Sequence, residues 1–391
     1  MGNATLRSHF ACSSRLAPRA FRPGVTLIEL LVTIMIISIL AAAVLGVAAV
    51  AGETAREAKT RTIISRIHTL LMQHYDTYTT RRVKLQPTVL NGINDPMLSA
   101  TTAQRGRLKA EARLYAMREL MLMEMPDRWS DVLLNVVPNP PANGVALDPL
   151  YFEAPPAPDL PGNPANRTEL GSLYLRTYRR IASANNKLTN NTNTTDQILA
   201  NQGAECLYMV VMNACGDGEA RTLFPASSIG DTDGDGAPEF LDGWGHPIEF
   251  LRWAPGFESD VQSSAQDMDN LPTPAERDSA WRVAGSADHD PFDLYRAQPN
   301  AFRLVPLVYS AGRDEESGLI DYPTFCTWRK PSPASVSFNL NFNVDAPRVL
   351  PTLNPYGKET PTNYYPDKYL GSATDRALAT DNIHNHLIGT R

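Results

Sequence analysis

The feature that most constrains this chain is an apolar run from Val25 to Val50 in which Glu29 is the one charged residue. At about 1.5 Å per residue, a helix of this length would extend over about 39 Å, more than the roughly 30 Å of a membrane hydrocarbon core. Residues 1–24 contain no acid, and the positive-inside rule keeps such a basic segment in the cytoplasm. Its arginines are Arg7, Arg15, Arg19 and Arg22. The run therefore predicts a single membrane span, with the bulk of the chain on the far side of the membrane.

Two ordinary interpretations of an N-terminal apolar run are a secretory signal peptide and an uncleaved signal anchor. A signal peptide has an apolar region of roughly 7–15 residues followed by a small-residue cleavage site, and residues 25–50 are too long for that class. An anchor has no use for Glu29, because a carboxylate is costly in hydrocarbon and is typical of a functional position there. Both interpretations therefore leave Glu29 unexplained.

The stretch from Arg22 to Leu31, RPGVTLIELL, resembles the processing site of type IV prepilins. The resemblance implies that a prepilin peptidase cleaves between Gly24 and Val25 and that the new terminus is methylated. It also implies that Glu29, then the fifth residue, compensates the terminal amine of a neighbouring subunit during assembly. Val25 stands where the family usually has phenylalanine. The expected partners are other pilin-like subunits, in a homo- or hetero-filament, and an inner-membrane assembly platform.

The net charge of the chain indicates whether nucleic acid is a partner. Removal of the leader, which contributes four arginines and no acid, changes the formal net charge from −6 to −10. An acidic surface repels phosphate backbones, so we do not expect the protein to bind nucleic acid. We expect a single-pass inner-membrane protein whose C-terminal head lies in the periplasm or in an extracellular filament.

The first helix is predicted to continue beyond the membrane. Apolar and aromatic residues recur at helical spacing along one face. They are Ile64, Ile67, Leu71, Tyr75 and Tyr78. We therefore expect one helix over residues 25–80, with residues 25–50 in lipid and the rest packed as an amphipathic helix on its own head.

The region 81–220 is predicted to be a large helical and loop-rich insertion. Helices are expected over residues 108–125 and about 169–187, whereas the proline-rich stretch 135–166 and the polar stretch 185–195 are expected to be loops. The helix expected around Cys206 and Cys215 would place their sulfurs about 13 Å apart on opposite faces, which disfavours a disulfide between them. A bridge from Cys326 to either one, or a buried free thiol, remains open.

The region 221–391 is predicted to be a β-rich head. Strands are expected over residues 247–253, 302–310 and 336–344, which are rich in aromatic and branched side chains. The expected fold class is α+β, with the long N-terminal helix packed on a small antiparallel sheet.

An acidic loop in this head is the second chemical signal. In the twelve residues from Asp231 to Asp242, aspartates occupy positions 1, 3 and 5, and glycine occupies position 6. Oxygen ligands at alternate positions surround a calcium ion, and glycine permits the sharp turn. The pattern resembles an EF-hand or dockerin-type loop without the flanking EF-hand helices, and the alternative is a solvated turn. The predicted ligands are the side chains of Asp231, Asp233, Asp235, Glu239 and Asp242 and the backbone carbonyl of Ala237.

Two later stretches extend the resemblance. The stretches DGWGHPIEF, over residues 242–250, and LVYSAGRDEESG, over residues 307–318, resemble the C-terminal half of the major pseudopilins of type II secretion. In that family the later loop binds calcium. Here Asp314, Glu315 and Glu316 are candidate ligands, but Arg313 and the spacing of the acids depart from the family pattern.

No common catalytic motif occurs in the sequence, so we do not expect an enzyme. His384 and His386 lie in a polar C-terminal tail, where we expect solvated side chains in preference to a metal site. The predicted function is a structural subunit, a pseudopilin or minor pilin of a type II secretion or type IV pilus-like filament, stabilised by calcium. The alternative is a membrane-anchored, extracytoplasmic calcium-dependent adhesin or hydrolase that uses the N-terminal helix only as an anchor.

Overall fold

The computed structural model describes residues 26–96, 100–133, 151–153, 167–184, 201–214, 220–321, 354–356 and 369–387. The chain divides into two compact units, residues 1–53 and 54–391. Several expectations fall outside the described residues: the basic leader with Gly24 and Val25, the strand over 336–344, and the cysteines Cys215 and Cys326.

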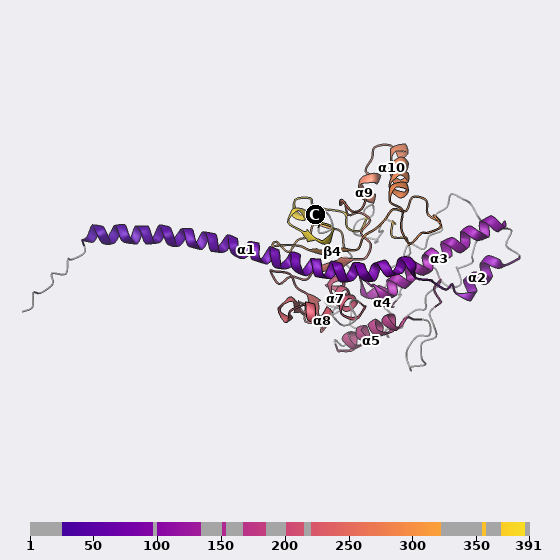
Figure 1. Cartoon of the computed structure of the whole chain (residues 1–391), viewed down its shortest axis with the longest axis horizontal. Coiled ribbons are helices and arrows are strands. Elements are labelled where there is room, and N and C mark those ends of the chain that lie inside the picture. Colours follow the sequence, from indigo (N-terminus) through magenta and orange to yellow (C-terminus); the bar gives the residue numbers. More distant parts are fainter. Residues whose placement is uncertain are drawn as a thin grey trace, which may run out of the picture. The chain divides into compact units, whose positions relative to one another are not determined.

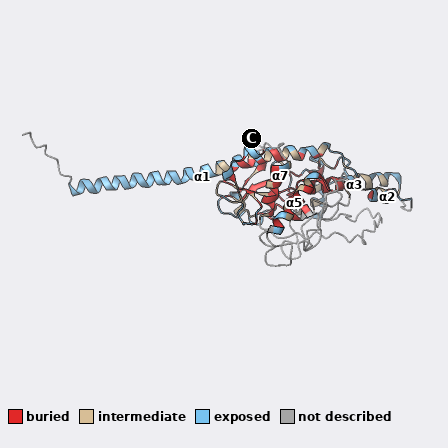
Figure 2. Cartoon of the chain, turned by 90° about the horizontal axis from the view of Figure 1, so that it is seen from below, coloured by how far each residue is buried: buried red, intermediate tan, exposed pale blue. Residues whose placement is uncertain are grey.

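Helix α1 (Leu27–Thr80) is continuous and runs through both units (Figure 1), as the sequence predicted. Residues 27–52 are exposed, including large apolar side chains such as Leu45, which is 71% exposed. In the second unit one face of α1 is buried (Figure 2). The buried residues there are Thr60, Ile63, Ile64, Ile67, Leu70, Leu71, Tyr75 and Tyr78. The apolar face of α1 from Ile63 to Tyr78 is therefore part of the core, whereas residues 27–52 are not.

The other helices begin at local capping signals where the sequence supplies them. Helix α3 (Thr102–Glu124) starts at a capping box, in which Thr101 and Gln104 satisfy each other's backbone N–H groups. Helices α3 and α5 (Glu169–Ala184) confirm the two helices expected in the middle region. The remaining helices are α2 (Pro87–Asn94), α4 (Trp129–Leu133), α7 (Gln202–Ala214), α8 (Ala220–Leu223), α9 (Ala265–Asp269) and α10 (Pro274–Ala287).

Two small antiparallel sheets lie within the described residues. Strands β1 (Ile229–Gly230) and β2 (Glu239–Phe240) pair around the acidic loop. Strands β3 (Glu249–Leu251), β4 (Leu307–Ser310) and β5 (Ile383–His384) form a sheet in the order β3-β4-β5. Strands β3 and β4 lie within the predicted strands 247–253 and 302–310. The predicted α+β class is therefore confirmed.

The described part of the region 221–391 is less rich in strands than expected, because it also contains α9 and α10. Helix α10 begins at a capping box formed by Thr273 and Glu276, with Pro274 in its first turn. This start signal stands in the sequence, and the sequence analysis overlooked it.

One hydrophobic core joins α1, α3, α5 and α7 to both sheets. Helix α7 is central, because it packs on β2 and on β3. A Cβ atom at Gly203 would lie 2.6 Å from Glu249 Oε2 and 3.1 Å from the carbonyl oxygen of Phe250, so glycine lets α7 approach β3 without displacing the Glu249 carboxylate. Residues from both 81–220 and 221–391 contribute to this core, although the boundary at residue 220 stays a prediction.

A buried ion cluster holds the end of α3 and helix α4 against β3. Arg252, 0% exposed, places Nη2 2.8 Å from Asp131 Oδ2 and 3.4 Å from Asp127 Oδ1. The backbone N–H of Arg252 donates to Asp127 Oδ2 at 2.9 Å, and its Nη1 donates to the carbonyl of Met125. Burial raises the pKa of Asp127 to about 6, against the opposing effect of the Arg252 charge. Each charge in the cluster therefore depends on its partners to remain buried.

Candidate functional site

The start of α1 is built around Thr26 and Glu29. Thr26 donates its backbone N–H and its hydroxyl to Glu29 Oε2, both at 2.9 Å, and Glu29 N–H donates to Thr26 Oγ1 at 3.3 Å. These reciprocal bonds form a capping box, which satisfies N–H groups at the first turn of the helix. Glu29 therefore has a local structural role that the sequence analysis did not assign.

The helix that follows is the one described segment long and apolar enough to cross a membrane. Its most apolar 18-residue window has a mean hydropathy of 2.8 and is 0% buried. The side chains of this part of α1 are apolar on every face, so hydrocarbon or other apolar helices suit them and water does not.

The acidic loop is the connection between β1 and β2, and its own backbone organises it. Asp231 accepts hydrogen bonds from the N–H groups of Gly234, at 2.7 Å, and Gly236, at 3.0 Å. Gly234 and Gly236 have φ angles of 76° and 92°, a region that favours glycine. Asp235 Oδ1 accepts from the N–H of Ala237 at 2.7 Å. The loop is therefore tightly wound, which agrees with both the calcium loop and the solvated turn that the sequence left open.

Two overlapping groups of three carboxylates gather at this loop. The outer triad is Asp231, Asp233 and Glu239, and the inner triad is Glu205, Asp233 and Asp235. Within each triad the ligand oxygens lie within 4.8 Å of one another. The structure thus brings together four of the predicted side-chain ligands and adds Glu205, which the sequence analysis missed.

Glu205 reaches the loop from the first turn of α7. It is 2% exposed, and its Oε2 atom accepts from the indole N–H of Trp129 at 2.5 Å. Burial, together with the charges of Asp235 and Asp233, raises the pKa of Glu205 to about 10. A clue to this residue lies in the sequence, because Glu205 is the one charged residue of the apolar segment 202–214.

The outer carboxylates are well supplied with hydrogen bonds. Glu239 accepts from Thr232 N–H at 3.1 Å, from the Thr232 hydroxyl at 3.3 Å, and from Asn201 Nδ2 at 3.2 Å. Burial raises the pKa of Glu239 to about 7. The outer triad is therefore stabilised in part by the protein's own donors.

Asp242, the predicted twelfth-position ligand, belongs to neither triad, so its role as a ligand stays a prediction. Asp242 Oδ1 accepts from three successive N–H groups, those of Trp244, Gly245 and His246, at 2.8–2.9 Å. Its Oδ2 accepts from the Ser310 hydroxyl at 2.7 Å. Both oxygens are thus used to fix the turn before β3 and to join it to β4. The carbonyl of Ala237 as a ligand stays a prediction.

The later acidic loop forms no comparable group. Glu315 Oε1 lies 2.6 Å from His246 Nε2, and Asp314 Oδ1 accepts from Glu316 N–H at 3.1 Å. Among the described residues, Asp314, Glu315 and Glu316 are not part of any cluster of three metal-ligating side chains.

His384 and His386 are not in a solvated tail, which corrects that expectation. His384 lies in β5, and His386 is 2% exposed in the turn that follows. Burial lowers the pKa of each imidazole to about 4, so both are neutral at pH 7. Ser259 Oγ lies 2.9 Å from His386 Nδ1, whereas His386 Nε2 has no hydrogen-bond partner among the described residues. Among the described residues, no carboxylate is hydrogen-bonded to the His386 ring.

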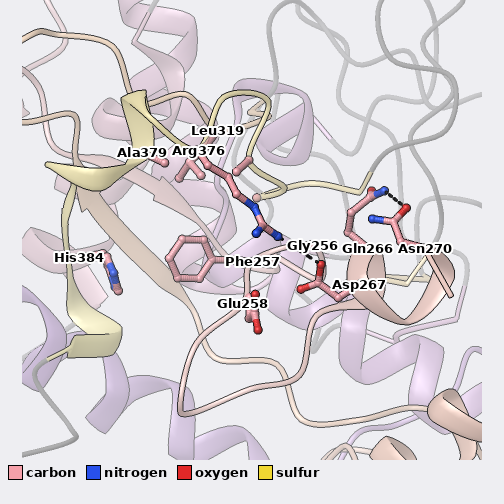
Figure 3. A pocket seen from close by; sticks show the side chains of 12 residues that line it. Gly256, Phe257, Glu258, Gln266, Asp267, Asn270, Leu319, Arg376, Ala379 and His384 are labelled. Carbon is pink, nitrogen blue, oxygen red and sulfur yellow. Dashed lines mark hydrogen bonds and ion pairs between the residues drawn. The ribbon is translucent and has the colours of Figure 1, made fainter.

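A pocket of about 490 Å³ lies beside β5 (Figure 3). Its lining includes Phe257, Glu258, Asp267, Arg376 and His384, and Figure 3 shows Arg376 extending toward Asp267. Arg376 Nη2 is 3.8 Å from Asp267 Oδ1, and the two side chains are 84% and 41% exposed. Such an exposed pair contributes little binding energy, so the pocket offers no strong determinant for a ligand.

Comparison with known proteins finds a match for the N-terminal segment. Residues 21–45 match the family model of the prokaryotic N-terminal methylation motif. No curated protein and no solved structure matches the chain. The match supports a type IV pilin-like protein, which in general is processed by a prepilin peptidase and assembles with other pilin-like subunits. With the apolar part of α1, it supports a membrane-anchored, single-pass protein.

Proposed function

We propose that the protein is a non-catalytic structural subunit of a type II secretion or type IV pilus-like filament. One observation carries this proposal. The methylation motif over residues 21–45 overlaps an exposed apolar helix, and the same helix continues as a core helix of the head. A helix that serves only as an anchor has no need to contribute to the core of the head, whereas α1 buries residues such as Ile64 and Tyr78 there.

We further propose that cleavage falls between Gly24 and Val25 and that Glu29 compensates the terminal amine of a neighbouring subunit. The position of Glu29 at the third residue of α1 supports this role, since it lies within a turn of the new terminus. Its bond to Thr26 is local and exposed, so the carboxylate is accessible to a partner.

The finer assignment to the pseudopilins of type II secretion rests on the DGWGHP turn and the strand that ends at Ser310. The structure joins these two motifs, because Asp242 accepts from Ser310 and β3 pairs with β4. The loop between β1 and β2 holds calcium in this proposal, with ligands from Asp231, Asp233, Asp235 and Glu239. An adhesin or hydrolase that uses α1 only as an anchor is the second candidate, favoured by the size of the region 81–220.

A test compares the wild type with Glu29→Ala and Glu29→Asp in cells that assemble filaments. We expect N-terminal mass spectrometry to show a methylated Val25 in all three. We also expect Glu29→Ala to be at least tenfold depleted from sheared filaments while it remains in the membrane, with partial recovery in Glu29→Asp. Normal incorporation of Glu29→Ala would reject the role of Glu29 in assembly. An intact Met1 in the wild type, or absence of the wild type from sheared filaments, would reject the filament role.

A further inference from the structure

We propose that Glu205 of α7 is a ligand of the divalent cation held at the β1–β2 loop, so that the ion ties a core helix to the loop. This inference rests on the proposed calcium site and deepens it, because Glu205 stands outside the twelve-residue pattern that suggested the site.

The first observation is an unsatisfied buried oxygen. Glu205 is 2% exposed, and its Oε1 atom has no hydrogen-bond partner among the described residues, although Trp129 occupies Oε2. The Oδ2 atom of Asp233 is likewise buried without a hydrogen-bond partner in the part of the chain that the structure describes. A buried carboxylate oxygen without a donor is costly, and a bound cation is one of the few arrangements that removes this cost.

The second observation is the geometry of the inner triad. The ligand oxygens of Glu205, Asp233 and Asp235 lie within 4.8 Å of one another. Calcium binds oxygen at about 2.3–2.6 Å, so ligands on opposite sides of one ion are separated by about 5 Å. The three oxygens therefore fit around a single ion, and three carboxylates with no sulfur or imidazole suit a hard cation such as calcium.

The inner triad is favoured over the outer triad by the hydrogen bonds already made there. Asp231 accepts from two glycine N–H groups, and Glu239 accepts from Thr232 and Asn201. By contrast, Glu205 and Asp233 each direct one unbonded oxygen into the protein. Asp233 belongs to both triads and is therefore the residue that connects the loop to α7.

The test uses the full-length protein in detergent micelles, with calcium chloride or a chelator. Glu205→Gln keeps an oxygen acceptor for Trp129 and removes the carboxylate that would bind the ion. We therefore expect Glu205→Gln to melt at about the wild-type temperature in chelator, because burial already disfavours a charge at this position when no ion is bound. We expect its calcium Kd to rise at least tenfold, so that most of the wild-type increase in Tm with calcium disappears.

Two further variants separate the possible results. Asp233→Asn should lose calcium affinity at least as strongly as Glu205→Gln, because it is shared by both triads. Asp242→Asn is the matched control, since its carboxylate fixes the turn before β3 and bonds to Ser310 of β4, and it lies in neither triad. This variant should lower Tm equally in calcium and in chelator, with the wild-type Kd. Equal calcium affinity of wild type and Glu205→Gln would overturn the role of Glu205 and leave the loop site intact.

A spectroscopic measurement locates the ion independently. Terbium(III), an oxygen-seeking substitute for calcium, should show luminescence sensitised by Trp129, whose indole bonds the proposed ligand. Trp129→Phe should abolish this signal while calcium still competes for terbium binding. An unchanged signal in Trp129→Phe would place the ion away from Glu205. If calcium neither binds the wild type nor raises its Tm, the calcium site itself fails, whereas the filament role remains subject to the Glu29 test.

Discussion

Glu29 and Glu205 are both carboxylates in the first turn of an apolar helix, in the first and second units of the chain. Glu29 bonds to Thr26, three residues away. Glu205 bonds to Trp129, 76 residues away, and faces a loop that begins at Asp231. The candidate functional residues of the N-terminal segment are therefore neighbours in the sequence, whereas those of the head are distant in the sequence and are brought together by folding.

This difference predicts that the two regions respond separately to mutation. Variants of the N-terminal segment should alter processing or assembly and leave the free energy of unfolding of the head unchanged. Variants of the buried contacts in the head should change that free energy, and cleavage after Gly24 should proceed normally. The predictions below test this separation from the largest effect to the smallest.

The largest effect is expected for Arg252→Met. This change leaves Asp127 and Asp131 buried with one guanidinium fewer. Arg128 Nε remains 3.1 Å from Asp131 Oδ1 but 3.9 Å from Asp127 Oδ1, and the loss should cost about 3–5 kcal/mol of unfolding free energy. Denaturant unfolding of the purified protein measures the loss, and N-terminal mass spectrometry should still show Val25. The control is Arg61→Met, which breaks the exposed pair with Glu57 and should cost about 0.3–0.5 kcal/mol. Similar losses in both variants would contradict the importance of the buried cluster.

A smaller effect is expected where α7 meets β3. Gly203→Ala places a methyl group against Glu249 and the backbone of Phe250, and overpacking of this kind costs about 1–3 kcal/mol. A gain of up to about 1 kcal/mol in helix propensity offsets part of this cost, so we expect a net loss of up to about 2 kcal/mol. Gly106→Ala in α3 is the matched change, because no atom lies within 4 Å of its added Cβ. That variant should gain about 0.5–1 kcal/mol from helix propensity. Thermal unfolding should thus give shifts of opposite sign, and equal signs would show that the close approach is not maintained in solution.

The smallest effect at pH 7 is expected at His386, because its contribution to the pH dependence develops only below about pH 6.5. Burial lowers the pKa of His386 to about 4 in the folded head, against about 6.5 in an unfolded chain. Between these values the unfolded state binds more protons, so stability should fall as pH drops from about 6.5 to 4. His386→Gln should weaken this dependence, as measured by Tm at each pH. Ser259→Ala, which removes the hydrogen-bond partner of His386 but no titrating group, should lower Tm and keep the wild-type pH dependence.

The sequence predicted those parts of the fold that depend on local pattern. The stripe from Ile64 to Tyr78 has helical spacing, and α1 buries it as expected. The strands β3 and β4 and the helices α3 and α5 were also predicted. The spacing of apolar side chains and the glycines and prolines at the ends of such elements can be recognised within a few neighbouring residues. Of the acidic loop, Asp231, Asp233, Asp235 and Glu239 come together, since the turn itself positions them.

The remainder depended on contacts between distant residues. Asp242 fits the spacing of a calcium loop, but its carboxylate accepts hydrogen bonds from the N–H groups of the following turn. The spacing of acidic residues in a sequence does not predict such hydrogen bonds. Glu205 was missed because its role exists only after α7 packs on β2. His386 was placed in a solvated tail because its burial depends on the strand pair that β5 forms with β4.

The capping box of Thr26 and Glu29 affects how densely subunits must be present in the membrane before a filament can start. Before assembly, Glu29 already accepts two hydrogen bonds from Thr26, so a neighbour's amine has to displace or share them. Loss of a helix cap costs about 1 kcal/mol, a factor of about five in an equilibrium constant. Under the proposed assembly role, this cost raises the membrane density at which subunits associate spontaneously by about the same factor. The cap would thus hold a reserve of separate subunits in the membrane until the assembly platform concentrates them.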